Sequence, residues 1–90
     1  MNSSTASEIA ISALTFLVSD EKEMARFLDL TGIDPSQIQQ IVDTKAFQTA
    51  ILDHLMRDEP VLLAFAASEG VDPGLIGKAR YTLSPDDERQ

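Results

Sequence analysis

The chain of 90 residues carries fifteen acidic and seven basic side chains, a formal net charge of −8, and no cysteine. This length suits one domain with one core, and the lack of cysteine excludes disulfides, thiolate zinc sites and cysteine nucleophiles. The acidic excess disfavours binding to nucleic acid and to anionic membranes, and it favours a basic partner or a simply solvated acidic surface.

Capping residues mark the start of each predicted helix. In chain order the predicted N-caps are Thr5, Asp20, Asp34, Thr44, Asp58 and Asp72. The second and fifth helices are expected to end at Gly32 and Gly70, because glycine readily adopts the left-handed conformation that closes a helix. Residues 1–6 are expected to be frayed, and the polar residues 84–90 are expected to form a tail.

The helical segments are joined by connections of only a few residues, and no segment shows the sustained alternating pattern of a β-strand. The sequence therefore predicts an all-α fold, a compact bundle of five or six helices in a single domain spanning residues 1–90. The apolar run 9–18 is too short to cross a bilayer and lacks the basic flank of a secretory signal. We therefore expect no membrane association and a cytoplasmic location.

An internal repeat is the most informative pattern. A shift of 38 residues aligns two tandem pseudo-repeats, about 9–38 and 47–76, with nine identities in 30 aligned positions. In the first copy the identical residues are Leu14, Leu17, Asp20, Glu21, Phe27, Gly32, Asp34, Pro35 and Ile38. These positions are caps, turns and apolar faces, which are the features that specify a helical unit. The copies could be related by a pseudo-twofold axis or stacked as two solenoid units.

Two stretches, residues 9–18 and 61–67, are apolar almost all round and are therefore expected to carry the packing. So small a domain cannot easily enclose both, so an apolar strip beside them, rimmed by acids, is expected to stay exposed. Such a strip suits a protein partner or a second copy in a homodimer. The sequence thus favours a non-catalytic protein-interaction or adaptor module.

A helix-turn-helix that binds nucleic acid is the alternative. Its spacing of a small residue, a glycine, a β-branched residue and a second aliphatic residue is met by Ala66, Gly70, Val71 and Ile76. The first copy supplies Gly32, Ile33 and Ile38 but has Leu28 where the small residue belongs. The recognition helices would be residues 35–42 and 73–81, with the exposed candidates Ser36, Gln37, Gln39, Gln40, Lys78 and Arg80. The net charge argues against this reading, because phosphate contacts need basic surface.

His54 is the only histidine, and Asp58, four residues on, could share its helix face, with Asp53 adjacent. One histidine and one carboxylate make at most half a metal site. In the repeat alignment His54 takes the place of Phe16, so a partly buried structural histidine is expected.

Other candidate chemistry also has structural explanations. The paired acids Asp20-Glu21 and Asp58-Glu59 begin helices, where the helix dipole stabilises negative charge. The aromatic residues Phe16, Phe27, Phe47, Phe65 and Tyr81 recur at repeat-equivalent places, which indicates a core. Neither a glycine-rich phosphate loop nor a serine nucleophile elbow occurs in the sequence. No catalytic, cofactor-binding or metal-binding residue is assigned, and no enzymatic activity is expected.

The segments 13–33 (ALTFLVSDEKEMARFLDLTGI) and 47–73 (FQTAILDHLMRDEPVLLAFAASEGVDP) resemble a family of short bacterial proteins. This family is common in alphaproteobacteria and is catalogued only as a domain of unknown function. The resemblance covers roughly residues 8–83 and implies no activity, ligand or functional residue. The chain departs from the family pattern at the lysine-containing acidic corner 20–23, which affects the surface rather than the core.

Overall fold

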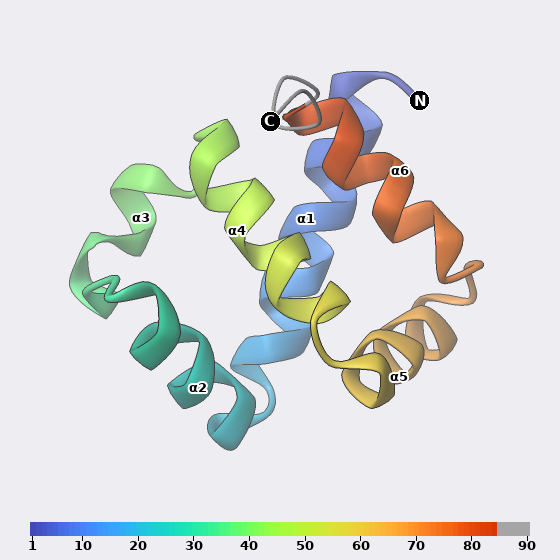
Figure 1. The fold of residues 1–90 in the computed structure, drawn as a ribbon. Coiled ribbons are helices and arrows are strands. Elements are labelled where there is room, and N and C mark those ends of the chain that lie inside the picture. Colours follow the sequence, from blue (N-terminus) through green and yellow to red (C-terminus); the bar gives the residue numbers. More distant parts are fainter. Residues whose placement is uncertain (85–90) are drawn as a thin grey trace.

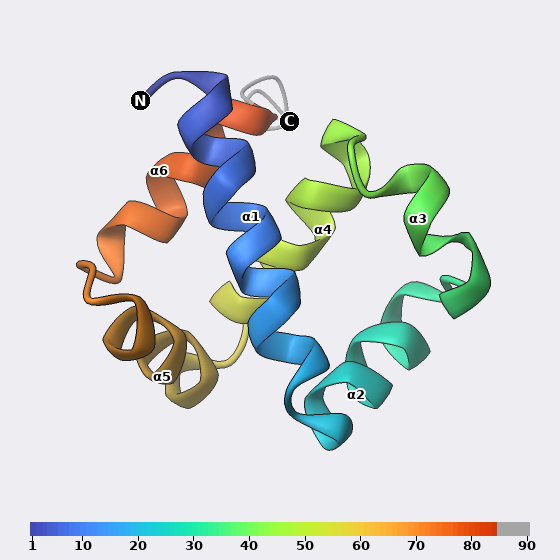
Figure 2. The ribbon, with the colours of Figure 1, turned by 180° about the vertical axis from the view of Figure 1, so that it is seen from behind.

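The computed structural model describes residues 1–84 as a compact arrangement of helices without a strand (Figures 1 and 2). Its elements are α1 (Ser3–Val18), α2 (Glu21–Thr31), the 3-10 turn η1 (Pro35–Gln37), α3 (Ile38–Ile41), α4 (Lys45–Met56), α5 (Glu59–Glu69) and α6 (Gly74–Leu83). The predicted all-α bundle is confirmed. The predicted tail lies, except for its first residue, outside the described residues.

Four of the predicted N-caps are confirmed, because Asp20, Asp34, Thr44 and Asp58 each accept a backbone N–H from the first turn of the following helix. The N-cap of α6 is Pro73, one residue later than predicted, although Asp72 still accepts the N–H of Gly74 at 2.8 Å. These bonds satisfy donors that the first turn of a helix leaves without an intrahelical partner.

The first helix begins earlier than predicted. The N-cap of α1 is Asn2, whose side-chain oxygen accepts the backbone N–H of Thr5 at 2.8 Å. The predicted cap at Thr5 is therefore wrong, and residues 3–6 are helical rather than frayed. Asparagine caps a helix at least as well as threonine, and the fully buried Ala6 packs the additional turn against the core.

The predicted helix ends at Gly32 and Gly70 are confirmed. Both glycines are left-handed, with φ of 72° and 69° respectively. A side chain at either position would strain the backbone, so glycine is what lets α2 and α5 stop there.

The centre of the molecule is formed by α1, α4 and α6, which pack closely against one another. The buried residues of α1 are Ala6, Ala10, Ala13 and Leu17. Their spacing of three or four residues places them on one face, and alanine is small enough to let helix backbones approach closely. The opposite face of α1 is left for other contacts.

The segment 61–67 is not the second central helix, contrary to the sequence-based expectation. Only Phe65 and Ala66 of α5 are buried, and Leu63 is 47% exposed. The central position belongs to α4, which buries Phe47, Gln48, Thr49, Ile51, Leu52, His54 and Leu55. Three of the seven residues in 61–67 are alanines, which bury little apolar area and can stay exposed at little free-energy cost.

Three of the five aromatic residues are buried in the core as predicted. Phe27, Phe47 and Phe65 are buried, which confirms their assignment to the core, and Phe16 is half-buried. Tyr81 is 53% exposed, so its assignment to the core is wrong. It lies on the outer face of α6, whose inner face carries other apolar residues.

The tandem repeat stays a prediction. The bounds of α2 and α5 do differ by the repeat shift. The third helices, however, are not alike, since α6 packs against α1 and α4 whereas α3 has no buried residue and lies mainly against η1. Figures 1 and 2 show α3 at the edge of the molecule beside α2.

Candidate functional site

A hollow of about 190 Å³ lies between α1 and α5. It is lined by Thr5, Glu8, Ile9 and Ser12 of α1, by Phe65 and Glu69 of α5, and by Val71. Its floor is apolar, and its two carboxylates come from different helices. A second hollow of about 300 Å³ adjoins it and shares Ser12 and Glu69.

We call the two hollows together the α1–α5 groove. The second hollow adds Thr15, Phe16, Ser19 and Ser68. The groove thus follows α1 from its first turn to its C-cap, and α5 forms the facing wall. One end is apolar with a carboxylate rim, and the other end is rich in hydroxyl groups.

The groove exists because α1 and α5 are not packed closely. Their ring contact is that of Phe16 with Phe65, an edge-to-face pair with centroids 5.4 Å apart. The closely packed partners of α1 are α6, α4 and α2. In Figure 2 the outer side of α1 faces the viewer, with α5 beside its lower half.

The carboxylates of the groove are not neutralised within residues 1–84. Glu8 and Glu69 are exposed, and neither forms an ion pair with another described residue. Glu69 also ends α5, where the helix dipole adds negative potential. This end of the groove therefore presents an apolar floor inside a field that attracts cations.

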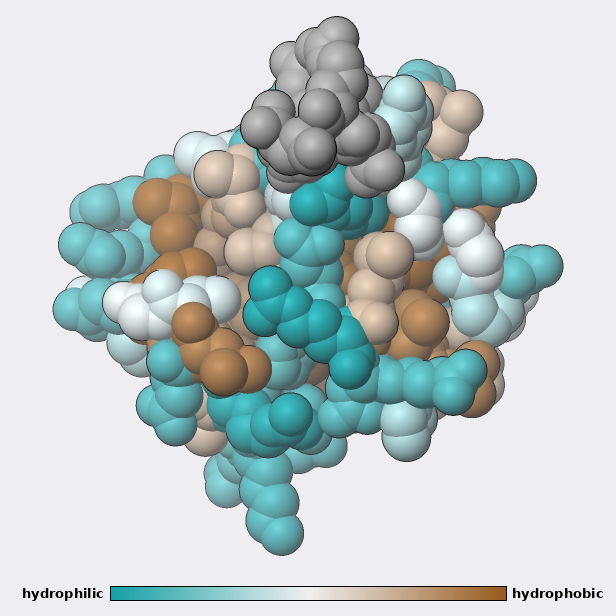
Figure 3. All heavy atoms as spheres, in the orientation of Figure 1, coloured by the Kyte–Doolittle hydropathy of each residue, from teal (hydrophilic) through white to brown (hydrophobic). Residues whose placement is uncertain are grey.

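A third hollow of about 230 Å³ lies between α3 and α4 and lacks charged lining residues. It is lined by Ile33, Ile41, Thr44, Ala46, Phe47 and Ala50. On the face shown in Figure 3, hydrophobic side chains gather over α3, whereas hydrophilic side chains cover the centre of that face. Without a charge this hollow has little to select one ligand over another.

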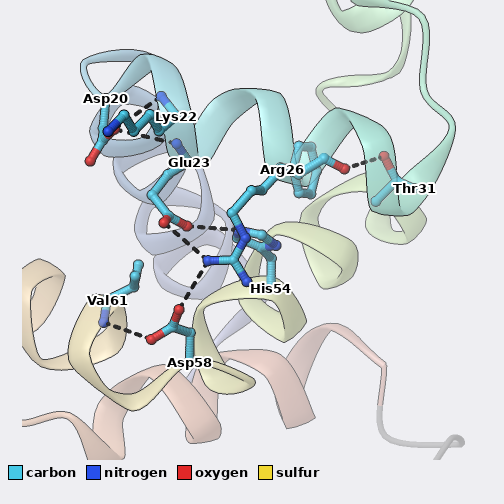
Figure 4. A network of polar contacts seen from close by, with 9 residues as sticks. Asp20, Lys22, Glu23, Arg26, Thr31, His54, Asp58 and Val61 are labelled. Carbon is cyan, nitrogen blue, oxygen red and sulfur yellow. Dashed lines mark hydrogen bonds and ion pairs between the residues drawn. The ribbon is translucent and has the colours of Figure 1, made fainter.

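His54 takes part in an ionic cluster rather than in a metal site. Its ring is 5% exposed, its Nε2 lies 3.3 Å from Oε1 of Glu23, and it packs edge-to-face on Phe27 at 5.4 Å (Figure 4). The expected burial of His54 is confirmed. The carboxylate neighbours expected from the sequence, Asp53 and Asp58, are bound by arginines instead.

Arg26 is the centre of this cluster. Its Nη1 lies 3.1 Å from Oδ2 of Asp58 and 3.2 Å from Oε2 of Glu23, so α2 is joined to the start of α5. The hydrogen bond to Asp58, and then the charge of Glu23, raise the pKa of the Arg26 guanidinium. Within residues 1–84 no three side chains of the ligating types come together in a way that could hold a metal ion. The cluster is suited to joining helices.

The candidate recognition helix of the second repeat, α6, packs against the core of the molecule. α6 buries Ile76, Ala79 and Leu83, and the guanidinium of Arg80 is bound to Asp53 at 2.8 Å and 3.3 Å. Lys78 is exposed. In the first copy Ser36, Gln37, Gln39 and Gln40 are all exposed on η1 and α3. The geometry therefore leaves little basic surface for phosphate contacts.

The sequence pointed to an acid-rimmed apolar strip but not to its residues. The available signal was the apolar content of residues 9–18, which exceeds what one buried face can hold. Which acids border the surplus depends on how α5 crosses α1, and this crossing is set by tertiary packing.

Comparison with known proteins finds a family that matches nearly the whole chain. A family model with the description "Protein of unknown function (DUF3572)" matches residues 3–86. No curated protein and no solved structure matches the chain. In the part of the chain that the structure describes, no helix has the length and apolar character needed to cross a membrane.

Proposed function

The chain belongs to the DUF3572 family of proteins of unknown function, and we propose that it is a non-catalytic protein-interaction module. Its α1–α5 groove binds an amphipathic helix of a partner protein, and that helix carries basic side chains beside an apolar stripe. The observation that carries the proposal is the pairing of an apolar floor with the unneutralised carboxylates of Glu8 and Glu69.

The apolar part of the groove supplies the affinity. The half-buried side chains of Ile9 and Val71 line the hollow beside the fully buried Phe65, and half-buried Phe16 lines the adjoining hollow. Covering such surface removes apolar area from water, and each buried large side chain contributes about 1.5–3 kcal/mol. Anchor residues repeating every three or four positions on one helix face reach a groove of this kind.

The charge selects the partner. The whole chain has a formal net charge of −8, and two of its acids border the hollow from opposite walls. A basic segment is therefore drawn to the surface before contact and held at its rim after contact. A second copy of this acidic chain would bring like charges together, so a basic partner fits better than a homodimer.

The length of the groove fits a helix of about four turns. Thr5 and Ser19, at its two ends, are separated by fourteen residues of helix at about 1.5 Å each, or about 21 Å. A partner helix of that length places an apolar residue near Phe65 and a lysine or arginine between Glu8 and Glu69.

A designed peptide tests the proposal. We choose a 16-residue helix of leucine, alanine and lysine, with leucines at helical spacing and lysines beside them. Amide chemical shifts and calorimetry follow its binding to the isotope-labelled protein. We expect shifts at residues 5–19 and 65–71, and none with a scrambled peptide or with one whose lysines are replaced by glutamates.

Matched variants test the role of the charges. Glu8→Lys with Glu69→Lys should weaken binding about tenfold, because two rim attractions become repulsions. Asp29→Lys with Asp43→Lys changes the net charge by the same amount at exposed positions outside the groove, and should weaken it much less. Equal losses in both double variants, shifts outside the groove, or no binding would each overturn the proposal.

The same experiments also test two other functions, self-association and nucleic-acid binding. A dimer in sedimentation whose interface shifts map to the groove would replace the basic partner by a second copy. Shifts at η1, α3 and α6 on addition of duplex DNA would promote the helix-turn-helix. Once the groove variants have shown that peptide binding is specific to the groove, a pull-down from lysate with and without nuclease identifies the partner protein.

A further inference from the structure

One ion pair crosses from α2 to α5 over 32 positions of the sequence. Nη1 of Arg26 donates to Oδ2 of Asp58 at 3.1 Å, while Oδ1 of Asp58 accepts the N–H of Val61 at 3.4 Å (Figure 4). One carboxylate therefore both caps α5 and connects its first turn to α2. A shift of α5 relative to α2 would break the connection.

Arg26 is held in place by a partner that is itself fixed. Oε2 of Glu23 accepts from Arg26 at 3.2 Å, and Oε1 faces the buried ring of His54. Because Glu23 is already fixed by His54, less side-chain freedom is lost when Arg26 binds Asp58 than in an isolated surface pair. The side chain of Asp58 is 26% exposed and that of Arg26 is 53% exposed, so water screens the pair from the Arg26 side and its contribution is modest.

α5 has few other attachments that fix its direction. Its buried residues are Phe65 and Ala66, Val61 and Leu62 near its start are half-buried against the core, and it packs closely only on α4, to which a short connection joins it. Phe65 can remain in contact with Phe16 while the helix pivots about it. The bridge at Asp58, about two helical turns before Phe65, supplies a second fixed point.

We propose that Arg26 is a positioning residue that sets how α5 crosses α1, and thereby sets the width of the α1–α5 groove. The inference rests on the proposed function of that groove. Removal of the guanidinium leaves Phe65 in the core but frees the start of α5. The wall of the groove then samples several positions, and a helix binds it less tightly because the wall must be ordered on binding.

The sign of the effect distinguishes positioning from general electrostatics. Removal of any positive charge makes the protein more acidic, and this should strengthen the binding of a basic peptide or leave it unchanged. Loss of a positioning residue should weaken binding. Arg57 is the matched control, since it is exposed, lies next to Asp58, and has no ion pair within the described residues.

The binding experiment compares Arg26→Met, Arg26→Lys and Arg57→Met with the same basic amphipathic peptide. We expect Arg26→Met to weaken binding about two- to fivefold. Arg26→Lys should recover part of the loss, because lysine can still reach one carboxylate, and Arg57→Met should bind as tightly as the unchanged protein or more tightly. If Arg26→Met binds as tightly as Arg57→Met, Arg26 is not a positioning residue.

A distance measurement tests positioning without any peptide. The chain has no cysteine, so spin labels at Ser4→Cys on α1 and Ala64→Cys on α5, both exposed, report the separation of the two helices. We expect Arg26→Met to broaden the distance distribution and Arg57→Met to leave it unchanged. An unchanged distribution in Arg26→Met overturns the inference. A broadened one with no peptide binding by the unchanged protein overturns the proposed function alone.

Discussion

Replacement of Phe27 by alanine is the most direct test of how α2 is held. Phe27 is the one buried residue of α2, and its exposed fraction is zero. Its ring packs edge-to-face on Phe47 at 6.0 Å and on His54 at 5.4 Å. Met24 and Leu28 of α2 are only half-buried against the core, so Phe27 makes the largest apolar contact of this helix.

The expected loss follows from these contacts. A buried phenylalanine replaced by alanine loses its transfer free energy and leaves a cavity, together about 3–5 kcal/mol. At about 0.05–0.15 kcal/mol per residue, a domain of 90 residues has a total stability of roughly 5–14 kcal/mol. The loss is therefore a large part of the total stability, and hydrogen exchange in α2 should increase more than in α1.

The assay is urea unfolding followed by circular dichroism, with Leu30→Ala as the control. Leu30 lies on the same helix but is 61% exposed, so its replacement should change the free energy of unfolding by less than about 0.5 kcal/mol. Phe65→Ala should fall in the same 3–5 kcal/mol range as Phe27→Ala, because both rings are fully buried. A loss under about 1 kcal/mol at either phenylalanine would refute the core equivalence that the repeat alignment assigns to them.

Two further predictions concern local conformation and pH. Gly70→Ala should destabilise the fold by about 1–2 kcal/mol because φ is +69°, whereas Gly77→Ala should stabilise it by about 0.5–1 kcal/mol. A Cβ at position 77 would lie 3.8 Å from Met56, which is an ordinary contact distance. Denaturant unfolding that ranks the stabilities of the two variants in the opposite order would contradict the prediction. The backbone N–H of Ser36, and then its hydroxyl, donate to Asp34 and lower the pKa of this carboxyl below 3.8. Its stabilising effect is therefore present above about pH 4 and is lost as the pH falls through the lowered pKa. A carbon-detected titration should show an upward move of the pKa in Ser36→Ala, and an unchanged value would refute this cause.

Most of the secondary structure was predictable because its signals are local. Asp20, Asp58 and Thr44 cap helices through bonds to N–H groups two or three residues away, and Gly32 ends one through its own φ. The exception is the start of α1 at Asn2, where burial of Ala6 in the core adds a turn that the local signal at Thr5 does not predict. Bounds set by such short-range bonds need no knowledge of the fold.

The sequence predicted the general character of the candidate site but not the residues that meet there. An apolar surplus near residues 9–18 with acids around it follows from composition. The meeting of Glu8 with Glu69, and of Arg26 with Asp58, does not follow, because each pair is brought together by the crossing of helices that are distant in sequence. The same reason explains why His54 binds Glu23 rather than either neighbouring aspartate.

The sequence by itself determined the all-helical class, where most helices start and stop, and the acidic net charge, because caps, glycine turns and charge act over a few residues or by simple summation. Tertiary structure decided that α4 rather than α5 is central, and that the surplus apolar surface forms a groove between α1 and α5. Different arrangements of apolar residues can fill a core of the same volume nearly as well as one another. The place of an apolar residue therefore depends on how all the helices share one small core.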